Sequence, residues 1–359
     1  MITLSLCMIV KNEENTIERC LSSCYSLFDE IIIVDTGSID KTKEICKKFT
    51  DKIYDFIWVN DFSKARNFGI EKCTSNYFMW LDADDVITKE NLQKLQELKT
   101  KISNEDVIML KYDIAFDEKN NPTFSYYRER ILKNNANFLF HDPVHEAIIP
   151  SGKIVFEDIS IQHRKVKVTP SDRNLKIYES LNKKEFTPRQ IFYYARELFF
   201  NNKIDKAIIN FKKFLKQKDG FFENKIDACK LLSKCYLIKN DVIKAKEILF
   251  YSFNFDIPRA EILCEIGYIY KDLYEYNKAI YYLNLATQKK PDKNSLGFVE
   301  PDYYNFIPFL ELCVCHYNLN NPELALTYNT LAKQIKPTNT TVLNNEKFLK
   351  DLIEKQKIE

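Results

Sequence analysis

The first 100 residues alternate between runs of consecutive apolar residues and segments in which apolar residues recur every three or four positions. The runs are typical of strands buried on both faces, and the spaced segments are typical of helices with one buried face. The expected strands span residues 4–10, 30–35, 53–58 and 77–81. The expected helices span residues 15–27, 40–49 and 62–73. This alternation predicts an α/β domain with an open, mostly parallel, Rossmann-like sheet covered by helices.

Polar side chains follow three of these strands. They are Lys11 and Asn12 after the first strand, Asp35 after the second, and Asp82 and Asp84 after the fourth. Because ligands bind beyond the carboxyl ends of the strands in such sheets, we expect the three loops to converge on one crevice. That crevice is the candidate functional site.

Three carboxylates lie close together after the fourth strand, at Asp82, Asp84 and Asp85. Clustered acids repel one another, and a divalent cation that bridges a phosphorylated substrate would compensate their charge, with Mg²⁺ or Mn²⁺ suited to oxygen ligands. The alternative is a solvated acidic turn that caps a helix expected to begin near Thr88. A D-x-D pattern alone favours the alternative, so the neighbouring segments decide between the two.

The second half of the chain carries an internal repeat, and no strand pattern is found from Arg189 onward. Four alanines each lie twelve residues after a small residue: Ala207, Ala245, Ala279 and Ala325 follow Ala195, Ser233, Gly267 and Cys313. Small residues at two such sites let paired helices approach closely. The spacing is close to the ~34-residue period of a helix-turn-helix repeat with insertions, and it resembles tetratricopeptide repeats.

These patterns divide the chain into an α/β domain, residues 1–175, and an all-α repeat domain, residues 176–359. Further strands of the first domain are expected at residues 107–116, 129–133 and 159–163. In the second domain we expect residues 292–302 to form an inserted loop, and His316 to be a core position of the last repeat rather than a metal ligand.

Composition narrows the class of protein. The chain has 359 residues, enough for two domains, and 53 basic against 51 acidic residues give a net charge of +2. This balance argues against a nucleic-acid partner. The apolar opening is too short for a membrane span or signal peptide, and the 10 cysteines fall in apolar patterns without a C-x-x-C pair. We therefore expect a cytoplasmic protein with buried free thiols.

Four segments, in order, resemble the GT-A glycosyltransferases of family 2. They are the opening strand and loop at residues 6–13, a D-x-G-S-x-D-x-T segment at 35–42, an F-S-x-A-R-N segment at 62–67, and the D-x-D segment at 81–85. The resemblance implies a nucleotide-sugar donor, expected to be a UDP-sugar. It also implies that Asp35 accepts a hydrogen bond from the base. The other residues expected at the nucleotide are Lys11, Asn12, Arg66, Asn67 and, on the ribose, Asp82.

The same resemblance implies a metal site and a general base. Asp84 would bind Mn²⁺ or Mg²⁺, and His163 would complete the coordination, although a histidine at a strand end is more often structural. Inverting transfer needs a base that takes the proton of the acceptor. Glu146 is the first candidate with His145 as its orienter, and Asp142 is the second candidate.

Each of these assignments has a structural alternative. Glu146 could instead be the salt-bridge partner of a neighbouring arginine, and Arg66 could be a surface residue of its helix. Residues 141–146 resemble a segment of family members that carry a helical-repeat tail, but Asp142 and Pro143 stand where a glycine is common. The shape of this loop is therefore open.

The acceptor is not encoded in these motifs. Members with this layout include sublancin-type enzymes, which glucosylate a cysteine of a small bacteriocin, and a helical-repeat surface favours a peptide or protein acceptor, modified on cysteine or serine. The alternatives are synthesis of a cell-surface glycan, a binding scaffold with an inactive transferase half, and a nucleotidyltransferase on the same sheet. The repeats could also pair two copies of the chain as a homodimer.

Overall fold

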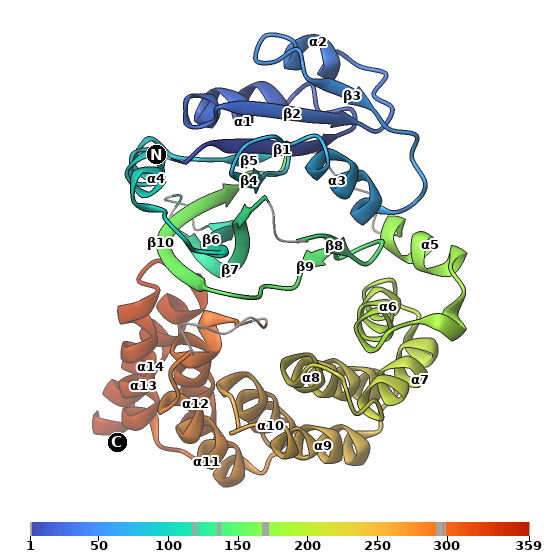
Figure 1. The fold of residues 1–359 in the computed structure, drawn as a ribbon. Coiled ribbons are helices and arrows are strands. Elements are labelled where there is room, and N and C mark those ends of the chain that lie inside the picture. Colours follow the sequence, from blue (N-terminus) through green and yellow to red (C-terminus); the bar gives the residue numbers. More distant parts are fainter. Residues whose placement is uncertain are drawn as a thin grey trace. The chain divides into compact units, whose positions relative to one another are not determined.

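The computed structural model describes residues 2–116, 120, 122–134, 138–166, 172–291, 297 and 299–358. The chain forms two compact units, Met1–Phe186 and Thr187–Glu359 (Figure 1). The boundary expected from the sequence, after residue 175, falls inside helix α5 (Arg173–Ser180). This helix belongs to the first unit because the hydroxyl of Tyr178 donates to the Val144 carbonyl, at 3.3 Å, and the Arg173 guanidinium lies 4.8 Å from the centre of the Phe62 ring.

The described residues of the first unit form a mixed, mostly parallel sheet. Its strands are β1 (Leu4–Val10), β2 (Glu30–Asp35), β3 (Ile53–Asp55), β4 (Tyr77–Trp80), β5 (Asp85–Val86), β6 (Val107–Phe116), β7 (Pro122–Lys133) and β10 (Ile154–His163). Their order in the sheet is β3-β2-β1-β4-β7-β6-β10-β5. Strands β8 (Phe140–His141) and β9 (Ala147–Ile148) form a separate hairpin. The α/β fold predicted from the sequence is confirmed.

Helices cover both faces of this sheet. They are α1 (Ile17–Cys24), α2 (Thr42–Cys46), α3 (Phe62–Ile70) and α4 (Lys89–Lys101). The Asp61 carboxylate accepts from the Lys64 amide at the start of α3, and the Thr88 hydroxyl accepts from the Asn91 amide at the start of α4. Such caps satisfy amides that have no partner inside the helix. Both α2 and β3 are shorter than expected, and β3 is an edge strand that pairs only with β2.

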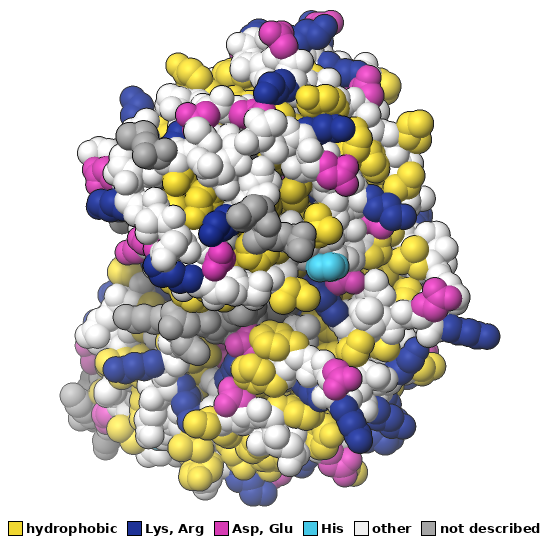
Figure 2. All heavy atoms as spheres, in the orientation of Figure 1, with side chains coloured by type: hydrophobic (Ala, Val, Ile, Leu, Met, Phe, Trp, Pro, Cys, Tyr) yellow, Lys and Arg dark blue, Asp and Glu magenta, His cyan; other side chains and the backbone are white. Residues whose placement is uncertain are grey.

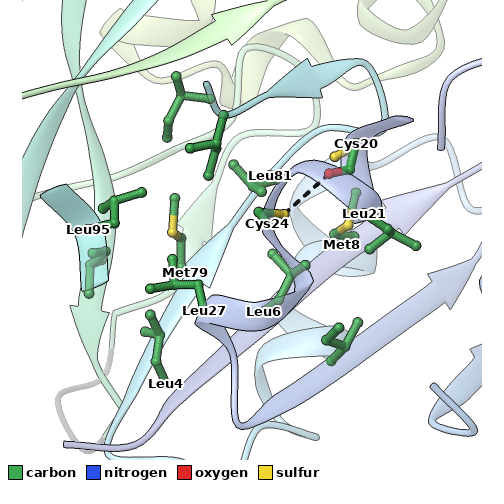
Figure 3. Close-up of a cluster of buried hydrophobic side chains, with 14 of the residues drawn as sticks. Leu4, Leu6, Met8, Cys20, Leu21, Cys24, Leu27, Met79, Leu81 and Leu95 are labelled. Atoms are coloured by element: carbon green, nitrogen blue, oxygen red, sulfur yellow. Dashed lines mark hydrogen bonds between the residues drawn. The ribbon is translucent and has the colours of Figure 1, made fainter. Parts of the chain in front are cut away.

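The core lies between the sheet and helices α1 and α4 (Figure 3). Leu6, Met8 and Met79 of the central strands meet Leu21 and Leu95 of these two helices, all at most 1% exposed. In Figure 3 the thiol of Cys24 also donates to the Cys20 carbonyl, at 3.3 Å. All ten cysteines are buried and free, as the sequence predicted.

The described part of the second unit contains four helix pairs and a final helix. The pairs are α6 (Pro188–Phe200) with α7 (Ile204–Leu215), α8 (Phe222–Ile238) with α9 (Val242–Tyr251), α10 (Ala260–Asp272) with α11 (Tyr276–Thr287), and α12 (Phe306–Asn318) with α13 (Pro322–Ile335), followed by α14 (Thr340–Ile358). The four repeat alanines are fully buried. A Cβ on Gly267 would lie 2.8 Å from Leu283, so the paired helices α10 and α11 touch closely there. The predicted tetratricopeptide-like repeats are confirmed.

The turns between the paired helices share one backbone conformation in all four pairs. Two residues after the end of each first helix lies a residue with a left-handed φ angle: 57°, 59°, 60° and 55° at Asn202, Asn240, Tyr274 and Asn320. The next amide bonds back to the last turn, as from Lys203 to the Leu198 carbonyl at 2.8 Å. A left-handed residue after the last turn is a common helix end, and asparagine tolerates it better than most side chains.

The last repeat contains the histidine noted in the sequence. His316 stacks on Tyr328, with ring centres 5.2 Å apart, so it packs in the repeat core as predicted. The expected loop at residues 292–302 lies largely outside the described residues; from Pro301 to Tyr304 the chain forms a short 3₁₀ helix, η4.

Two surface features bear on possible partners. None of the helices within the described residues is both long and apolar enough to cross a membrane. Basic and acidic side chains are intermingled on the face drawn in Figure 2, in keeping with the small net charge.

We expect Gly69→Ala to destabilise the first unit. A Cβ there would lie 2.6 Å from the Cys7 sulfur and 3.0 Å from the Val34 Cγ2. Overpacking of this kind costs about 1–3 kcal/mol, and the better helix propensity of alanine returns up to ~1 kcal/mol, so the net loss should be about 1 kcal/mol. The fluorescence of the chain's two tryptophans, Trp58 and Trp80, reports unfolding of this unit alone because both lie in it.

The matched control is a double-mutant cycle with Cys7→Ala. Because this change removes the sulfur that the new methyl group would meet, the double variant should be more stable than the sum of the two single effects. Strict additivity would show that helix α3 does not approach β1 as closely as described.

Candidate functional site

A cleft of ≈ 760 Å³ opens at the carboxyl ends of β1, β2 and β4. Lys11, Asn12, Thr36, Asp82 and Asp84 line one side of it. Residues 144–146 and helix α5 line the other side, and His163 lies beside Asp84. The three polar loops picked out in the sequence therefore converge, as predicted, and the whole cleft belongs to the first unit.

Arg66 of helix α3 joins the two sides of the cleft. Its Nη2 donates to Asp82 Oδ1 and its Nε to Glu146 Oε1, each at 2.7 Å. Burial alone would lower the pKa of Arg66, but the charges of Asp82 and Glu146 raise it, so the guanidinium stays charged. Although burial opposes it, the charges of Arg66 and Arg130 lower the pKa of Asp82 to about 2. One buried cation thus holds two carboxylates in the cleft.

Arg66 is 7% exposed, so the reading of it as a surface residue is wrong. The buried Nη1 of Arg66 has no hydrogen-bond partner among the described residues. The guanidinium also lies 4.9 Å from the Trp80 ring and 5.2 Å from the Phe140 ring, which hold it from the core side. A buried donor without a partner is costly, so this nitrogen is a position for a ligand oxygen or a water molecule.

Asp35 ends β2 beside the cleft and shapes its own loop. Its Oδ2 accepts from the amides of Gly37 and Ser38, at 3.1 and 3.0 Å. Gly37 has a φ of +102°, which side chains rarely adopt, and this explains the glycine of the motif. The second oxygen, Oδ1, is buried without a hydrogen-bond partner among the described residues. Asp35 is not among the residues that line the cleft, so its hydrogen bond with a ligand N–H stays a prediction.

The two asparagines of the motifs hold loops together. The Asn12 amide donates to Ser38 Oγ at 2.9 Å, and Asn12 Oδ1 accepts from the Ile39 amide at 2.8 Å, while Asn12 also lines the cleft. Asn67 does not line it: its Nδ2 donates to the Phe140 carbonyl at 2.9 Å and its Oδ1 accepts from the Phe140 amide at 2.8 Å. The expected contact of Asn67 with a nucleotide is therefore replaced by a role in positioning β8.

Asp84, Asp85 and His163 form the group that could hold a metal ion, with one ligand atom of each within 4.8 Å of the others. Asp84 Oδ1 lies 3.3 Å from His163 Nδ1, and both residues line the cleft. Burial by itself would lower the pKa of His163, but hydrogen bonds to Asp84 and Asp85 raise it to about 10. A cation would displace this proton, since metal ligands must be deprotonated. One oxygen and one nitrogen at a cleft wall, with room for phosphate oxygens and water, suit Mn²⁺ or Mg²⁺.

Asp85 differs from its two neighbours because it is fully buried. It accepts from the Asp82 amide at 3.0 Å, the Tyr112 hydroxyl at 2.8 Å and Arg130 Nη1 at 3.2 Å. The Tyr112 hydroxyl also lies 2.8 Å from His163 Nδ1. Asp85 therefore anchors Tyr112, and Tyr112 orients His163. The sequence pattern at residues 82–85 does not show that Asp85 is structural while Asp84 faces the cleft.

The loop before Glu146 has a left-handed backbone at two positions. Asp142 has a φ of 75° and His145 a φ of 55°. This explains why a glycine is common at the first position in the resembling segment, and it shows that aspartate takes the same conformation here. His145 and Glu146 line the cleft, and Asp142 lies outside its wall. The arginine partner considered for Glu146 is present, and it keeps the carboxylate at the cleft.

Sequence reasoning missed the basic residues of the far wall. Lys165, Arg173 and Lys176 line the cleft together with Lys11. Four basic side chains in one cleft favour a polyanionic ligand. No local pattern marks the far-wall residues, because helix α5 reads as an ordinary amphipathic helix and only its packing brings it here.

Comparisons with known proteins agree with these features. The model of the family described as glycosyl transferase family 2 matches residues 5–156. The SPbeta prophage-derived glycosyltransferase SunS of Bacillus subtilis is 31% identical over 256 residues, 64% of this chain and 58% of SunS. A TPR repeat-containing protein of Synechococcus elongatus is 33% identical over 149 residues, 41% of this chain and 36% of that protein. The chain thus spans little more than half of SunS.

Among solved structures, the crystal structure of S. aureus TarS 1-349 in complex with UDP-GlcNAc is similar over 68% of this chain and 90% of that chain. The TM-score is 0.40 and the sequences are 14% identical.

We expect Tyr112→Phe to weaken Mn²⁺ binding by about 10–100-fold, because loss of a partner that orients a metal-ligating histidine has this effect. Asp84→Asn should weaken it further by removing a charged ligand. The measurement is a titration of free Mn²⁺ followed by electron paramagnetic resonance, with UDP present and absent. Tyr126→Phe is the control, since its ring packs 5.9 Å from that of Tyr112. Equal affinity in Tyr112→Phe and Tyr126→Phe would contradict the orienting role.

Proposed function

We propose that this chain, whose residues 5–156 belong to glycosyl transferase family 2, transfers a sugar from a UDP-sugar to a peptide or protein acceptor with inversion at the anomeric carbon. The observation that carries the proposal is the ion-pair bridge from Asp82 through Arg66 to Glu146. The bridge brings Asp82 and Glu146 into one cleft beside Asp84 and His163, which supports a role for Asp82 at the donor and for Glu146 as the base. An inactive scaffold would have no need to keep these buried charges together.

The donor's nucleotide fits the wall formed by the first strands. Uracil carries a ring N–H that can donate to the buried Oδ1 of Asp35, whereas the corresponding cytosine nitrogen is an acceptor. Asp82 is 31% exposed at its side chain and can accept from a ribose hydroxyl while Arg66 holds its other side. Lys11, Lys165 and Arg173 bring positive charge to the diphosphate.

Asp84 and His163 would hold Mn²⁺ or Mg²⁺ at the same place. The bound cation would neutralise the charge that develops on the departing diphosphate. Asp85 and Tyr112 supply the support that keeps His163 in position. The fit rests on the two cleft-lining ligand atoms and the basic residues opposite them.

In the transfer step the acceptor's heteroatom attacks the anomeric carbon while the bond from this carbon to the diphosphate oxygen breaks. The acceptor's proton passes to Glu146, and UDP leaves on the opposite face of the sugar. Arg66 fixes the orientation of Glu146 by holding Oε1. His145 stands next to it at the cleft. Asp142, the second candidate base, lies outside the wall, which favours Glu146.

The acceptor is assigned from the helical repeats and from the similarity to SunS. Helical repeats of this kind offer an extended surface for a peptide, and the resemblance to enzymes that modify a cysteine or serine of a small peptide points the same way. The distant similarity to SunS supports this choice over a glycan acceptor. A homodimer through the repeats is compatible with it.

We expect Glu146→Gln to lower the transfer rate by about 10² or more, the usual contribution of a general base, with little change in UDP affinity. Glutamine can still accept from Arg66, so the geometry should persist. Single-turnover transfer and calorimetric UDP binding measure the two effects, and Glu71→Gln at the exposed end of α3 is the control. Transfer at the parent rate would show that another residue is the general base, and Asp142 would be tested next.

We also expect Asp35→Asn to weaken UDP binding, by about 1.5–3 kcal/mol for a hydrogen bond to a charged group, and to shift preference toward CDP. The amide can keep one oxygen on the Gly37 and Ser38 amides while its NH₂ faces the base. Calorimetry with UDP and CDP measures both changes. Asp55→Asn, at an exposed carboxylate on β3, should bind as the parent does. If the ratio of UDP affinity to CDP affinity is unchanged in Asp35→Asn, the uracil ring binds at another place.

A further inference from the structure

A segment of the second unit lies against the repeat helices in the manner of a bound peptide. It comprises Val299 to Tyr304, between α11 and α12. The Glu300 carboxylate pairs with Lys230 of α8, and the Glu300 amide donates to Glu261 Oε1 of α10 at 3.1 Å. The Tyr304 hydroxyl donates to Glu261 Oε2 at 2.9 Å. We call residues 299–304 the strap.

Further contacts follow along α10. The Tyr303 hydroxyl donates to Glu265 Oε1 at 3.0 Å, and the Cys264 thiol donates to the Tyr303 carbonyl at 3.7 Å. The strap therefore contacts two helices with its backbone and with three side chains. This mixture of main-chain and side-chain bonds is how proteins commonly recognise an extended peptide.

The helix faces beneath the strap bury charged groups. Asp227 and Lys230 of α8 and Glu261 and Glu265 of α10 are 5–8% exposed. Charged side chains are rarely buried unless they are paired. Asp227 pairs with both Arg196 and Lys230, and Glu265 pairs with Lys234. Lys230 has a second partner in the strap, and Glu261 accepts hydrogen bonds from the strap. These faces are thus built for polar contacts with a chain that lies across them.

We propose that this face of α8 and α10 is a peptide-binding site, and that the strap is an internal ligand that competes with an external peptide of the same chemistry. The external partner carries an acidic residue followed, three and four positions later, by two tyrosines. Its carboxylate replaces Glu300 on Lys230, and its second tyrosine replaces Tyr304 on Glu261. This goes beyond the transferase activity and does not depend on it.

The two ends of the strap are held differently. Glu300 is 42% exposed at its side chain. Tyr303 is 8% exposed and belongs to the apolar cluster of α10 and α12, so it is the firmer anchor. A tethered segment competes at an effective concentration of about the millimolar range. Weakening the strap should therefore strengthen the binding of an external peptide.

The experiment uses the full chain and a fluorescein-labelled peptide with the strap sequence, Val-Glu-Pro-Asp-Tyr-Tyr, followed by fluorescence anisotropy. The variant Glu300→Ala/Tyr304→Phe removes the side-chain contacts of Glu300 with α8 and of Tyr304 with α10, and it keeps both aromatic rings and the contacts of Tyr303. We expect it to bind the peptide at least about tenfold more tightly than the parent chain does. Glu346→Gln is the matched control, because Glu346 of α14 pairs with Lys333 of α13, outside the strap. It should bind as the parent does.

A third variant tests the place of binding. Lys230→Met added to the double variant should abolish the gain in affinity. A peptide of scrambled sequence should bind weakly to every variant. Hydrogen exchange on the parent chain supplies a second readout: excess peptide should speed exchange in the strap and slow it in α8 and α10.

Two results would overturn the proposal. Equal affinity of the double variant and the parent, with unchanged exchange in the strap, would make the strap a fixed part of the repeat core. Equal binding of the scrambled peptide would show that the site does not select the proposed chemistry. Neither result bears on donor binding, so the transferase proposal would stand or fall separately.

Discussion

The cleft depends on the buried guanidinium of Arg66. It ties helix α3 to the end of β4 through Asp82 and to the β8–β9 turn through Glu146. Removing one partner from a buried ion pair typically costs about 3–5 kcal/mol, because the remaining charge is left without compensation. The segments that carry Asp82 and Glu146 are therefore coupled through one side chain, and displacing either carboxylate would leave the Arg66 guanidinium with one partner fewer.

The fold was predictable where a pattern is local and strong. Buried strands on both sides of β1 show as continuous apolar runs, and small residues at repeat spacing mark the helix pairs. The extent of the edge strand was less predictable: β3 pairs with β2 alone, and it ends where this pairing ends. Helix α5 was not among the elements expected from the sequence, and its place in the first unit depends on Tyr178 reaching Val144, a contact between residues far apart in the chain.

The same distinction between local patterns and distant contacts applies to the site residues. Asp35, Asp82 and Asp84 follow strands directly, so their convergence could be inferred from the order of elements. The roles of Asn67 and Tyr112 could not be inferred, because each depends on a partner on a distant segment, at Phe140 and at His163. Neighbouring acids differ for the same reason. Asp84 faces the cleft, whereas Asp85 points toward Arg130 inside the domain.

A buried polar atom without a partner marks a ligand position only where it faces open space. Arg130 leaves Nε and Nη2 without hydrogen-bond partners among the described residues, yet its guanidinium lies 3.7 Å from the Trp80 ring and 4.3 Å from the Tyr112 ring, whose faces stabilise a cation. Arg66 lines the cleft, so its Nη1 can meet a ligand oxygen or a water molecule there. In the second unit the comparable groups, Lys230 and Glu261, meet the strap instead. The buried charges of the second unit thus have partners within the chain, whereas Arg66 keeps one donor without a partner among the described residues.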